Sequence, residues 1–76
     1  MEHKRKIKLS ETGDVREFVA SASKCDFDID VFYNRITVDA KSLLGVFSLD
    51  LSKRLTVVYS GVNSDFERTL QKFCAA

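Results

Sequence analysis

Several residue types that often mark chemistry are scarce in this sequence. It has no proline and no tryptophan, a single histidine (His3) and two cysteines, Cys25 and Cys74. One histidine and two distant cysteines are too few for a disulfide scaffold or a structural zinc site. We therefore expect no metal site and no cofactor, and we interpret the cysteines as reduced thiols that pack as small apolar side chains.

An excess of charge of one sign is also absent. The chain has 12 Lys and Arg against 11 Asp and Glu, which gives a formal net charge of +1. A dedicated nucleic-acid binder needs a basic stripe that neutralises phosphates. The one basic cluster, residues 3–6, lies at the terminus, where such a run is usually a solvated end. We therefore expect no direct contact with nucleic acid.

Long apolar runs are missing as well. No run approaches the ~18 residues of a membrane-spanning helix, and Met1–Arg5 is not followed by the apolar stretch of a signal peptide. We expect a cytoplasmic protein without membrane contact. With 76 residues, 45% of them apolar, the chain is predicted to form one small globular domain over residues 1–76. We find no base–nucleophile pair and do not expect an enzyme.

In the first third of the chain, the residue pattern predicts a strand and a helix. Apolar residues alternate with polar ones around Ile7 and Leu9, which predicts a short first strand. After a turn, Asp14 and Glu17 fit a helix cap and its partner three residues on. The helix then runs for about three turns and ends near Lys24. Its predicted buried face comprises Val15, Phe18, Val19 and Ala22.

The middle of the chain predicts a hairpin followed by a short helix. The clearest alternation covers residues 27–33, and Asn34-Arg35 can turn this strand back into a second one over residues 36–38. Three aspartates share one face of the strand over residues 27–33, so that face is either solvated or lies beside a basic strand. They are Asp26, Asp28 and Asp30. Ser42 is a suitable N-cap for a helix that begins near Leu43.

The last third predicts a strand and a final helix. Alternation over residues 55–60 indicates a fourth strand, which Gly61 ends. Ser64 and Glu67 have the spacing of a capping box. The predicted buried stripe of the helix is Phe66, Leu70, Phe73 and Cys74. The element order is therefore βαββαβα, an α+β fold with a four-stranded antiparallel sheet and three helices on one face.

The segment Val38–Leu49, VDAKSLLGVFSL, resembles the regulatory segment of the HPr family, whose pattern there is close to VNAKSIMGVMSL. HPr is the small phosphocarrier of the bacterial phosphoenolpyruvate:sugar phosphotransferase system. The resemblance extends over nearly the whole chain and implies the HPr open-faced β-sandwich. The flanking residues that follow the family order are Phe18-Val19, Ile29–Val31, Tyr33-Asn34 and Leu55–Val57.

The phosphotransfer motif of that family, Gly-Leu-His-x-Arg-Pro at the start of the first helix, is absent here. Its histidine position falls near Glu11 or Thr12, and its arginine and proline positions fall on Gly13 and Asp14. We interpret His3 as a solvated terminal residue before the first strand, without the arginine and the helix N-terminus that the motif supplies. We therefore assign no catalytic residue and predict that the protein is not a competent phosphocarrier.

Ser42 matches the regulatory serine of the family. In HPr proteins of low-GC Gram-positive bacteria, HPr kinase phosphorylates this serine, and the product acts as a corepressor with a catabolite-control transcription factor. A phosphate at a helix N-terminus meets free N–H groups and the positive end of the helix dipole, and Lys41 adds a positive charge. A role of Ser42 as helix cap alone accounts for the residue equally well.

The resemblance also implies a docking surface. Leu43, Leu44 and Phe47 match the exposed apolar patch through which HPr binds partners, and Lys41 lies beside them. On so short a helix some of these side chains must face away from the sheet. The apolar residues predicted for the core are Val46 and Leu49. The alternative is that all five apolar residues of this segment lie in the core.

These observations predict a serine-phosphorylatable interaction module, similar to the catabolite-repression HPr paralogue. Its expected partners are HPr kinase, a catabolite-control transcription factor or phosphotransferase components, and the protein is expected to be a monomer or a weak homodimer. One alternative is a phosphocarrier that passes phosphate from enzyme I to sugar-specific permease components through His3 or another acceptor. A degenerate paralogue that only binds proteins is a further alternative. A constitutive imitation of phosphohistidine by Glu11 or Asp14 is disfavoured, because a carboxylate has less charge and fewer oxygens than a phosphate.

Overall fold

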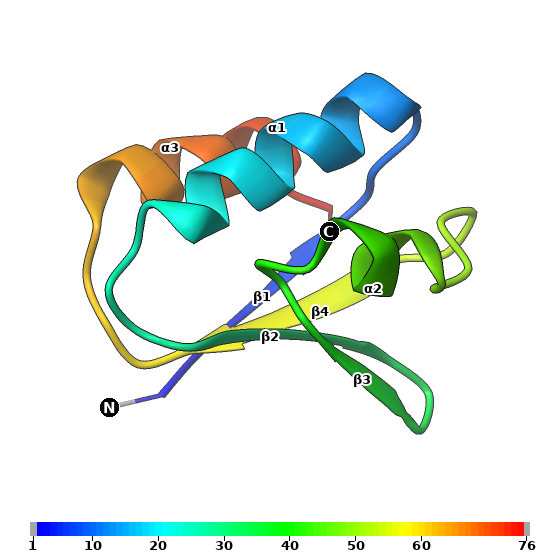
Figure 1. Cartoon of the computed structure of the whole chain (residues 1–76), viewed down its shortest axis with the longest axis horizontal. Coiled ribbons are helices and arrows are strands. Elements are labelled where there is room, and N and C mark those ends of the chain that lie inside the picture. Colours follow the sequence, from blue (N-terminus) through cyan, green and yellow to red (C-terminus); the bar gives the residue numbers. More distant parts are fainter. Residues whose placement is uncertain (1, 76) are drawn as a thin grey trace.

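The computed structural model describes residues 2–75, and these residues form four strands and three helices in the order βαββαβα (Figure 1). This order and the α+β class confirm the prediction from the sequence. The elements are β1 (His3–Ile7), α1 (Thr12–Ser23), β2 (Ile29–Tyr33), β3 (Ile36–Asp39), α2 (Leu43–Phe47), β4 (Leu55–Tyr59) and α3 (Ser64–Lys72).

The four strands form one antiparallel sheet in the order β1-β4-β2-β3. The two-residue turn predicted at Asn34-Arg35 joins β2 to β3, and Asn34 has the positive φ of 56° that such a turn favours. Strand β1 pairs with β4, so that Ile7 lies opposite Leu55. The last residues of the described chain continue the sheet beyond β1, because Cys74 forms an isolated bridge with Ile7.

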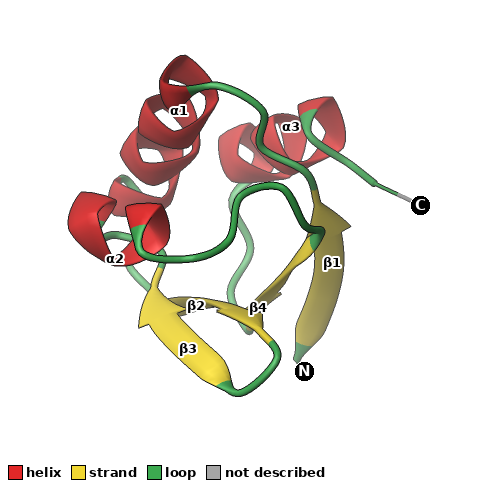
Figure 2. Cartoon of the chain, turned by 90° about the vertical axis from the view of Figure 1, so that its right-hand side faces the viewer, coloured by secondary structure: helices red, strands yellow, loops and turns green. Residues whose placement is uncertain are grey.

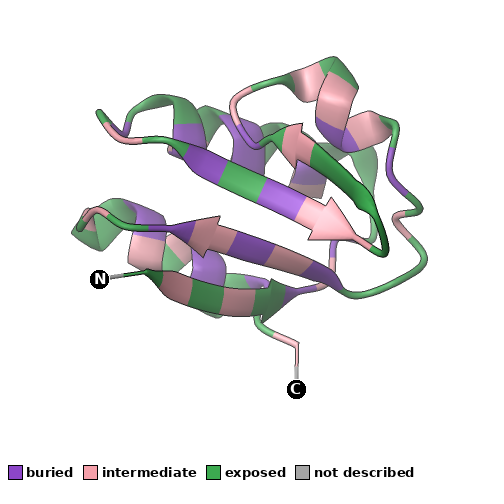
Figure 3. Cartoon of the chain, turned by 90° about the horizontal axis from the view of Figure 1, so that it is seen from below, coloured by how far each residue is buried: buried purple, intermediate pink, exposed green. Residues whose placement is uncertain are grey.

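All three helices lie on one face of the sheet (Figure 2). Alternate residues of each strand point toward the helices, and the remaining residues point away, onto a face that no helix covers (Figure 3). Helix α1 contacts both α2 and α3. The rings of Phe18 on α1 and Phe66 on α3 lie 6.1 Å apart and join these two helices above the sheet.

The core lies between the helices and the sheet and confirms most of the predicted buried residues. The helix α1 stripe is buried as predicted, as are Phe66 and Leu70 on α3. Cys25 is 4% exposed, in agreement with its interpretation as a small apolar side chain. Cys74, however, is exposed, so its predicted place in the buried stripe of α3 is wrong. The residue lies beyond the end of that helix, in the bridge to β1.

Two predicted strand boundaries are wrong. Strand β1 begins at His3 and ends at Ile7, and Leu9 is buried in the loop that follows. His3 therefore lies within the first strand and not before it. At β2 the prediction is too long, because the strand begins at Ile29 and Phe27 packs against the core from the preceding loop.

The helix caps lie slightly earlier than predicted. Glu11 is the N-cap of α1, and Asp14, the predicted cap, occupies the third helical position and bonds back to the backbone. At α3 the cap is Asn63, whose side chain accepts a hydrogen bond from Phe66 N at 3.0 Å, and not Ser64. Within residues 2–75, no helix is both long and apolar enough to cross a membrane.

Candidate functional site

Ser42 caps helix α2, as predicted. Its backbone is extended (φ −99°, ψ 109°), and its Oγ accepts a hydrogen bond from Gly45 N at 3.1 Å. Its carbonyl accepts from Val46 N at 3.0 Å, which begins the helical hydrogen-bond ladder. The residue is exposed. Its hydroxyl is therefore fixed in position by the cap and remains accessible to a modifying enzyme.

The apolar residues of α2 divide between the core and the surface. Val46 is fully buried and Leu49 is 5% exposed, so both lie in the core as predicted. Leu44 is 84% exposed. Leu43 and Phe47 are half-buried and pack against the edge of the core. We call Leu43, Leu44 and Phe47 the α2 patch; Leu44 is the member of this patch that projects furthest into solvent.

Lys41 links the α2 segment to the end of α1. Its Nζ donates a hydrogen bond to the Cys25 carbonyl at 2.8 Å, and its backbone N donates to Asp39 Oδ1 at 2.9 Å. The positive charge thus lies beside the carbonyl end of α1, where the helix dipole favours a cation. Burial raises the pKa of the neighbouring Cys25 thiol, and Lys41 partly opposes this effect. Cys25 is therefore a neutral thiol at physiological pH.

The start of α1, where the resemblance to HPr predicts the histidine position, is held by hydrogen bonds between Asp14 and the preceding backbone. Asp14 Oδ2 accepts hydrogen bonds from Ser10 N at 3.0 Å and from Glu11 N at 3.2 Å. The Glu11 side chain is exposed. The Asp14 carboxylate thereby pairs with two backbone N–H groups of the segment that leads into the helix, as the acidic residue of a capping box does. Residues 10–15 include no histidine and no basic side chain.

A cluster that the sequence analysis missed joins β1, β4 and α3. The Tyr59 hydroxyl donates a hydrogen bond to the Glu67 carboxylate, and Arg5 Nη1 lies 2.8 Å from Glu67 Oε1. Burial, together with the hydrogen bond to Glu67 and its charge, raises the pKa of Tyr59 to about 12. The His3 ring lies 5.1 Å from the Tyr59 ring. His3 is therefore half-buried against Tyr59, and its interpretation as a solvated terminal residue is wrong.

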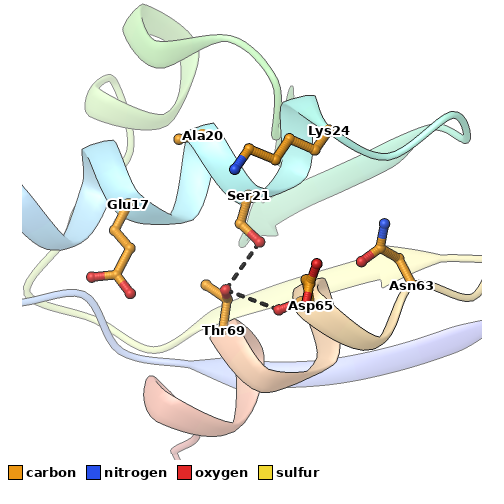
Figure 4. A pocket seen from close by; sticks show the side chains of 7 residues that line it. All are labelled: Glu17, Ala20, Ser21, Lys24, Asn63, Asp65 and Thr69. Atoms are coloured by element: carbon orange, nitrogen blue, oxygen red, sulfur yellow. Dashed lines mark hydrogen bonds between the residues drawn. The ribbon is translucent and has the colours of Figure 1, made fainter.

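A polar groove of about 270 Å³ runs between α1 and α3 (Figure 4). The Ser21 and Thr69 hydroxyls form a hydrogen bond of 2.9 Å at the bottom of this groove. Because the Thr69 hydroxyl has one proton and donates it to the Asp65 carbonyl at 3.2 Å, Ser21 is the donor to Thr69. Glu17 lies at one side and bonds to Lys72. These polar groups mainly join the two helices. No local pattern in the sequence could have paired Ser21 with Thr69, because they come from helices at opposite ends of the chain.

The same arrangement of elements occurs in solved phosphocarrier proteins, although no family model matches the chain. The chain aligns with phosphocarrier protein HPr from Bacillus anthracis with a TM-score of 0.66 and 24% identity, over 93% of this chain and 90% of that one. The corresponding values for HPr from Thermoanaerobacter tengcongensis are 0.69 and 27%, over 95% and 88%. The histidine-containing phosphocarrier protein from Mycoplasma gives 0.72 and 14%, over 100% of both chains. The chain therefore has the open-faced β-sandwich fold of the HPr phosphocarrier proteins, as predicted from the segment Val38–Leu49.

Proposed function

We propose that this protein is a serine-regulated interaction module of the phosphotransferase system and not a competent phosphocarrier. The observation that carries the proposal is the geometry of the α2 segment. An exposed serine hydroxyl, fixed by the helix cap, stands next to Leu44, which is 84% exposed. A modification site thus lies beside an apolar docking surface, so that a phosphate on Ser42 would change the charge of the surface that a partner contacts.

The start of α1 supports the second half of the proposal. A phosphocarrier needs a nucleophile that accepts a phosphoryl group and releases it again, and it needs donors that stabilise the charge. Here the histidine position falls near Glu11 or Thr12 and the arginine position on Gly13, and the nearby Asp14 carboxylate is occupied by two backbone hydrogen bonds. A carboxylate cannot carry phosphate through the phosphoramidate chemistry of an imidazole. His3 lies on β1, packed against Tyr59 and without a helix N-terminus.

A phosphate on Ser42 fits the cap geometry. The Gly45 N–H now bonds to Ser42 Oγ at 3.1 Å, and an oxygen of a phosphoserine can accept the same hydrogen bond. A Cβ on residue 45 would lie 3.1 Å from Ser42 Oγ, so the glycine keeps this side of the hydroxyl open. Both features support Ser42 as the modification site of this proposal.

The first experiment tests Ser42 directly. We expect HPr kinase and ATP to add one phosphate, located on Ser42 by mass spectrometry and absent from the Ser42→Ala variant. Ser48→Ala is the matched control, because Ser48 is an exposed serine at the other end of the same helix. Unphosphorylated wild-type protein would overturn the regulatory proposal. Failure of this reaction together with retained partner binding would favour the degenerate paralogue.

The second experiment tests phosphotransfer. With phosphoenolpyruvate and enzyme I, we expect no acid-labile label on the protein. Label that disappears in a His3→Ala variant would overturn the proposal in favour of a carrier that uses His3. Label that persists in that variant would instead indicate an acceptor elsewhere in the chain.

The third experiment tests the α2 patch. Leu44→Ala should lower the kcat/KM of Ser42 phosphorylation several-fold, because Leu44 contributes contact area only in the complex. Val62→Ala is the matched control, since Val62 is 85% exposed but lies in the loop before α3. Both variants should change the free energy of unfolding by less than about 0.5 kcal/mol. Equal effects of the two substitutions on phosphorylation would remove the patch from the docking surface.

A further inference from the structure

Figure 3 shows the face of the sheet that the helices leave uncovered, and the charged residues of this face lie at defined positions along its strands. Strand β1 presents Lys4 and Lys6 on this face, and both are exposed. Asp30 of β2 and Asp39 of β3 are exposed on the same face, because the register places Lys4 opposite Val58, Val58 opposite Asp30, and Asp30 opposite Asp39. One row across the sheet therefore runs from a cation at one edge to carboxylates at the other.

These charges are not neutralised within the described chain. None of Lys4, Lys6, Asp30 and Asp39 forms a salt bridge to another residue between positions 2 and 75. The strand spacing of about 4.8 Å puts β1 and β2 roughly 10 Å apart, and Lys4 and Asp30 form no salt bridge across β4. The face is thus positive at Lys4 and Lys6 of β1, with Glu2 beside them, and negative at Asp30 and Asp39 of β2 and β3.

Apolar side chains occupy the middle of this face. Phe32 and Val58 are half-buried and border a shallow hollow of about 270 Å³. The hollow is bounded by Lys4 on one side and by Asp30 and Thr37 on the other, with Glu2 at its end. A surface with an apolar centre and opposite charges at its two edges is complementary to a copy of itself that is turned by 180° about an axis parallel to the strands.

We propose that two copies of this chain associate through these open faces. A twofold axis parallel to the strands places β1 of one copy over β3 of the other, and β4 over the partner's β2. Lys4 then lies over Asp39 of the other copy, and Lys6 lies over Thr37, about 7 Å further along the same strand. Val58 lies over Asp30 and Phe32 over Thr56 at the centre of the interface. Sheets that pack face to face lie about 10 Å apart with strands inclined by about 30°, which this arrangement permits.

The size of the face sets the strength of the association. Four strands of about five residues cover roughly 17 by 19 Å, or about 320 Å² on each copy. Stable interfaces bury about 800 Å² per partner. The dimer is therefore weak, and because its charges are exposed it depends strongly on salt. This association is independent of Ser42 and of the α2 patch, which lie on the helical side of the molecule.

Sedimentation equilibrium tests the proposal with the intact chain. We expect dimerisation of the wild-type protein in about 10 mM salt, where the Debye length is about 30 Å, and monomers in about 0.5 M salt. Lys4→Glu/Lys6→Glu and Asp30→Lys/Asp39→Asn should each raise the dissociation constant roughly tenfold or more. Asparagine is chosen at position 39 because its Oδ1 can still accept the hydrogen bond from Lys41 N. An equimolar mixture of the two variants should form a heterodimer.

A matched control separates this face from the overall charge. Arg16→Glu/Lys24→Glu has the same net charge as Lys4→Glu/Lys6→Glu, but both of its positions are exposed on the helical layer. We expect it to dimerise as the wild type does. A wild-type protein that stays monomeric in low salt would overturn the proposal, and this face would then be free to bind a different molecule. Equal losses in the control and the face variant would also overturn it, as would a dimer that survives both charge changes.

Discussion

The Tyr59→Phe substitution should change the pH dependence of stability in a specific way. The Tyr59 side chain is 3% exposed, and its hydroxyl donates to Glu67, which Arg5 also contacts at 2.8 Å. Phenylalanine keeps the ring contacts with Phe66 and removes only the hydroxyl. The substitution therefore isolates the hydrogen bond that joins β4 to α3.

The expected magnitude at neutral pH is modest. A hydrogen bond to a charged group contributes about 1.5–3 kcal/mol when both partners are shielded from water. The Glu67 side chain is 36% exposed and keeps Arg5, so solvent and the guanidinium can compensate part of the loss. We expect Tyr59→Phe to lower the free energy of unfolding by about 1 kcal/mol at pH 7.

At high pH the sign of the effect changes. The pKa of Tyr59 is raised from 10.0 to about 12, mainly by burial and then by Glu67. The folded state therefore favours the neutral phenol by up to ~2.7 kcal/mol relative to the unfolded chain. This contribution is fully present below pH 10 and is lost as the pH rises from about 10 to about 12. Phenylalanine does not titrate, so the wild type should fall below the variant near the upper end of this range.

Urea unfolding followed by circular dichroism at several pH values between about 7 and 12 measures this difference. The comparison with the variant cancels the titration of lysines, which occurs in both proteins. Tyr33→Phe is the control, and it leaves Tyr59 as the only tyrosine, so that phenolate absorbance reports its pKa directly. A constant difference in stability between the wild type and Tyr59→Phe from pH 8 to pH 12 would refute the reasoning.

Two further pairs of variants test local geometry, each by thermal or urea unfolding. Gly61→Ala should lower the free energy of unfolding by about 1–3 kcal/mol, because its Cβ would lie 2.0–2.5 Å from ring atoms of Phe27. Gly13→Ala, in open space within α1, should raise it by about 0.5–1 kcal/mol, and an equal loss at both glycines would contradict the packing argument. Asn63→Ala should lower it by about 1 kcal/mol and Ser64→Ala by less than about 0.5 kcal/mol, and the reverse order would show that Ser64 is the cap of α3.

The fold followed from the sequence wherever apolar residues had a clear period. The stripe that includes Phe18 and the alternation from Leu55 to Tyr59 both predicted their elements correctly. The start of β1 did not follow, because its helix-facing positions hold His3 and Arg5, whose polarity hides the alternation. These residues face inward because they pair with Tyr59 and Glu67, which lie far away in the sequence.

The α2 segment was predictable for a different reason. Ser42, Gly45 and Val46 belong to a local capping arrangement, in which each contact joins residues three or four positions apart. Such contacts leave a pattern in the sequence. The caps of α1 and α3 were less accurate, because neighbouring residues such as Asn63 and Ser64 are both suitable by type, and only the backbone geometry selects between them.

The pairing of β1 has a consequence for the order in which the chain becomes structured. In the sheet, Ile7 lies opposite Leu55. The same segment is also bonded to residues 73–75: Lys8 N donates to Phe73 O, and Ala75 N donates to Lys6 O, both at 2.9 Å. The β2–β3 hairpin, by contrast, closes over two residues. During synthesis, β1 leaves the ribosome before β4 and α3, so it is among the last elements of this fold to find its partners. The high contact order of this one strand should limit the folding rate.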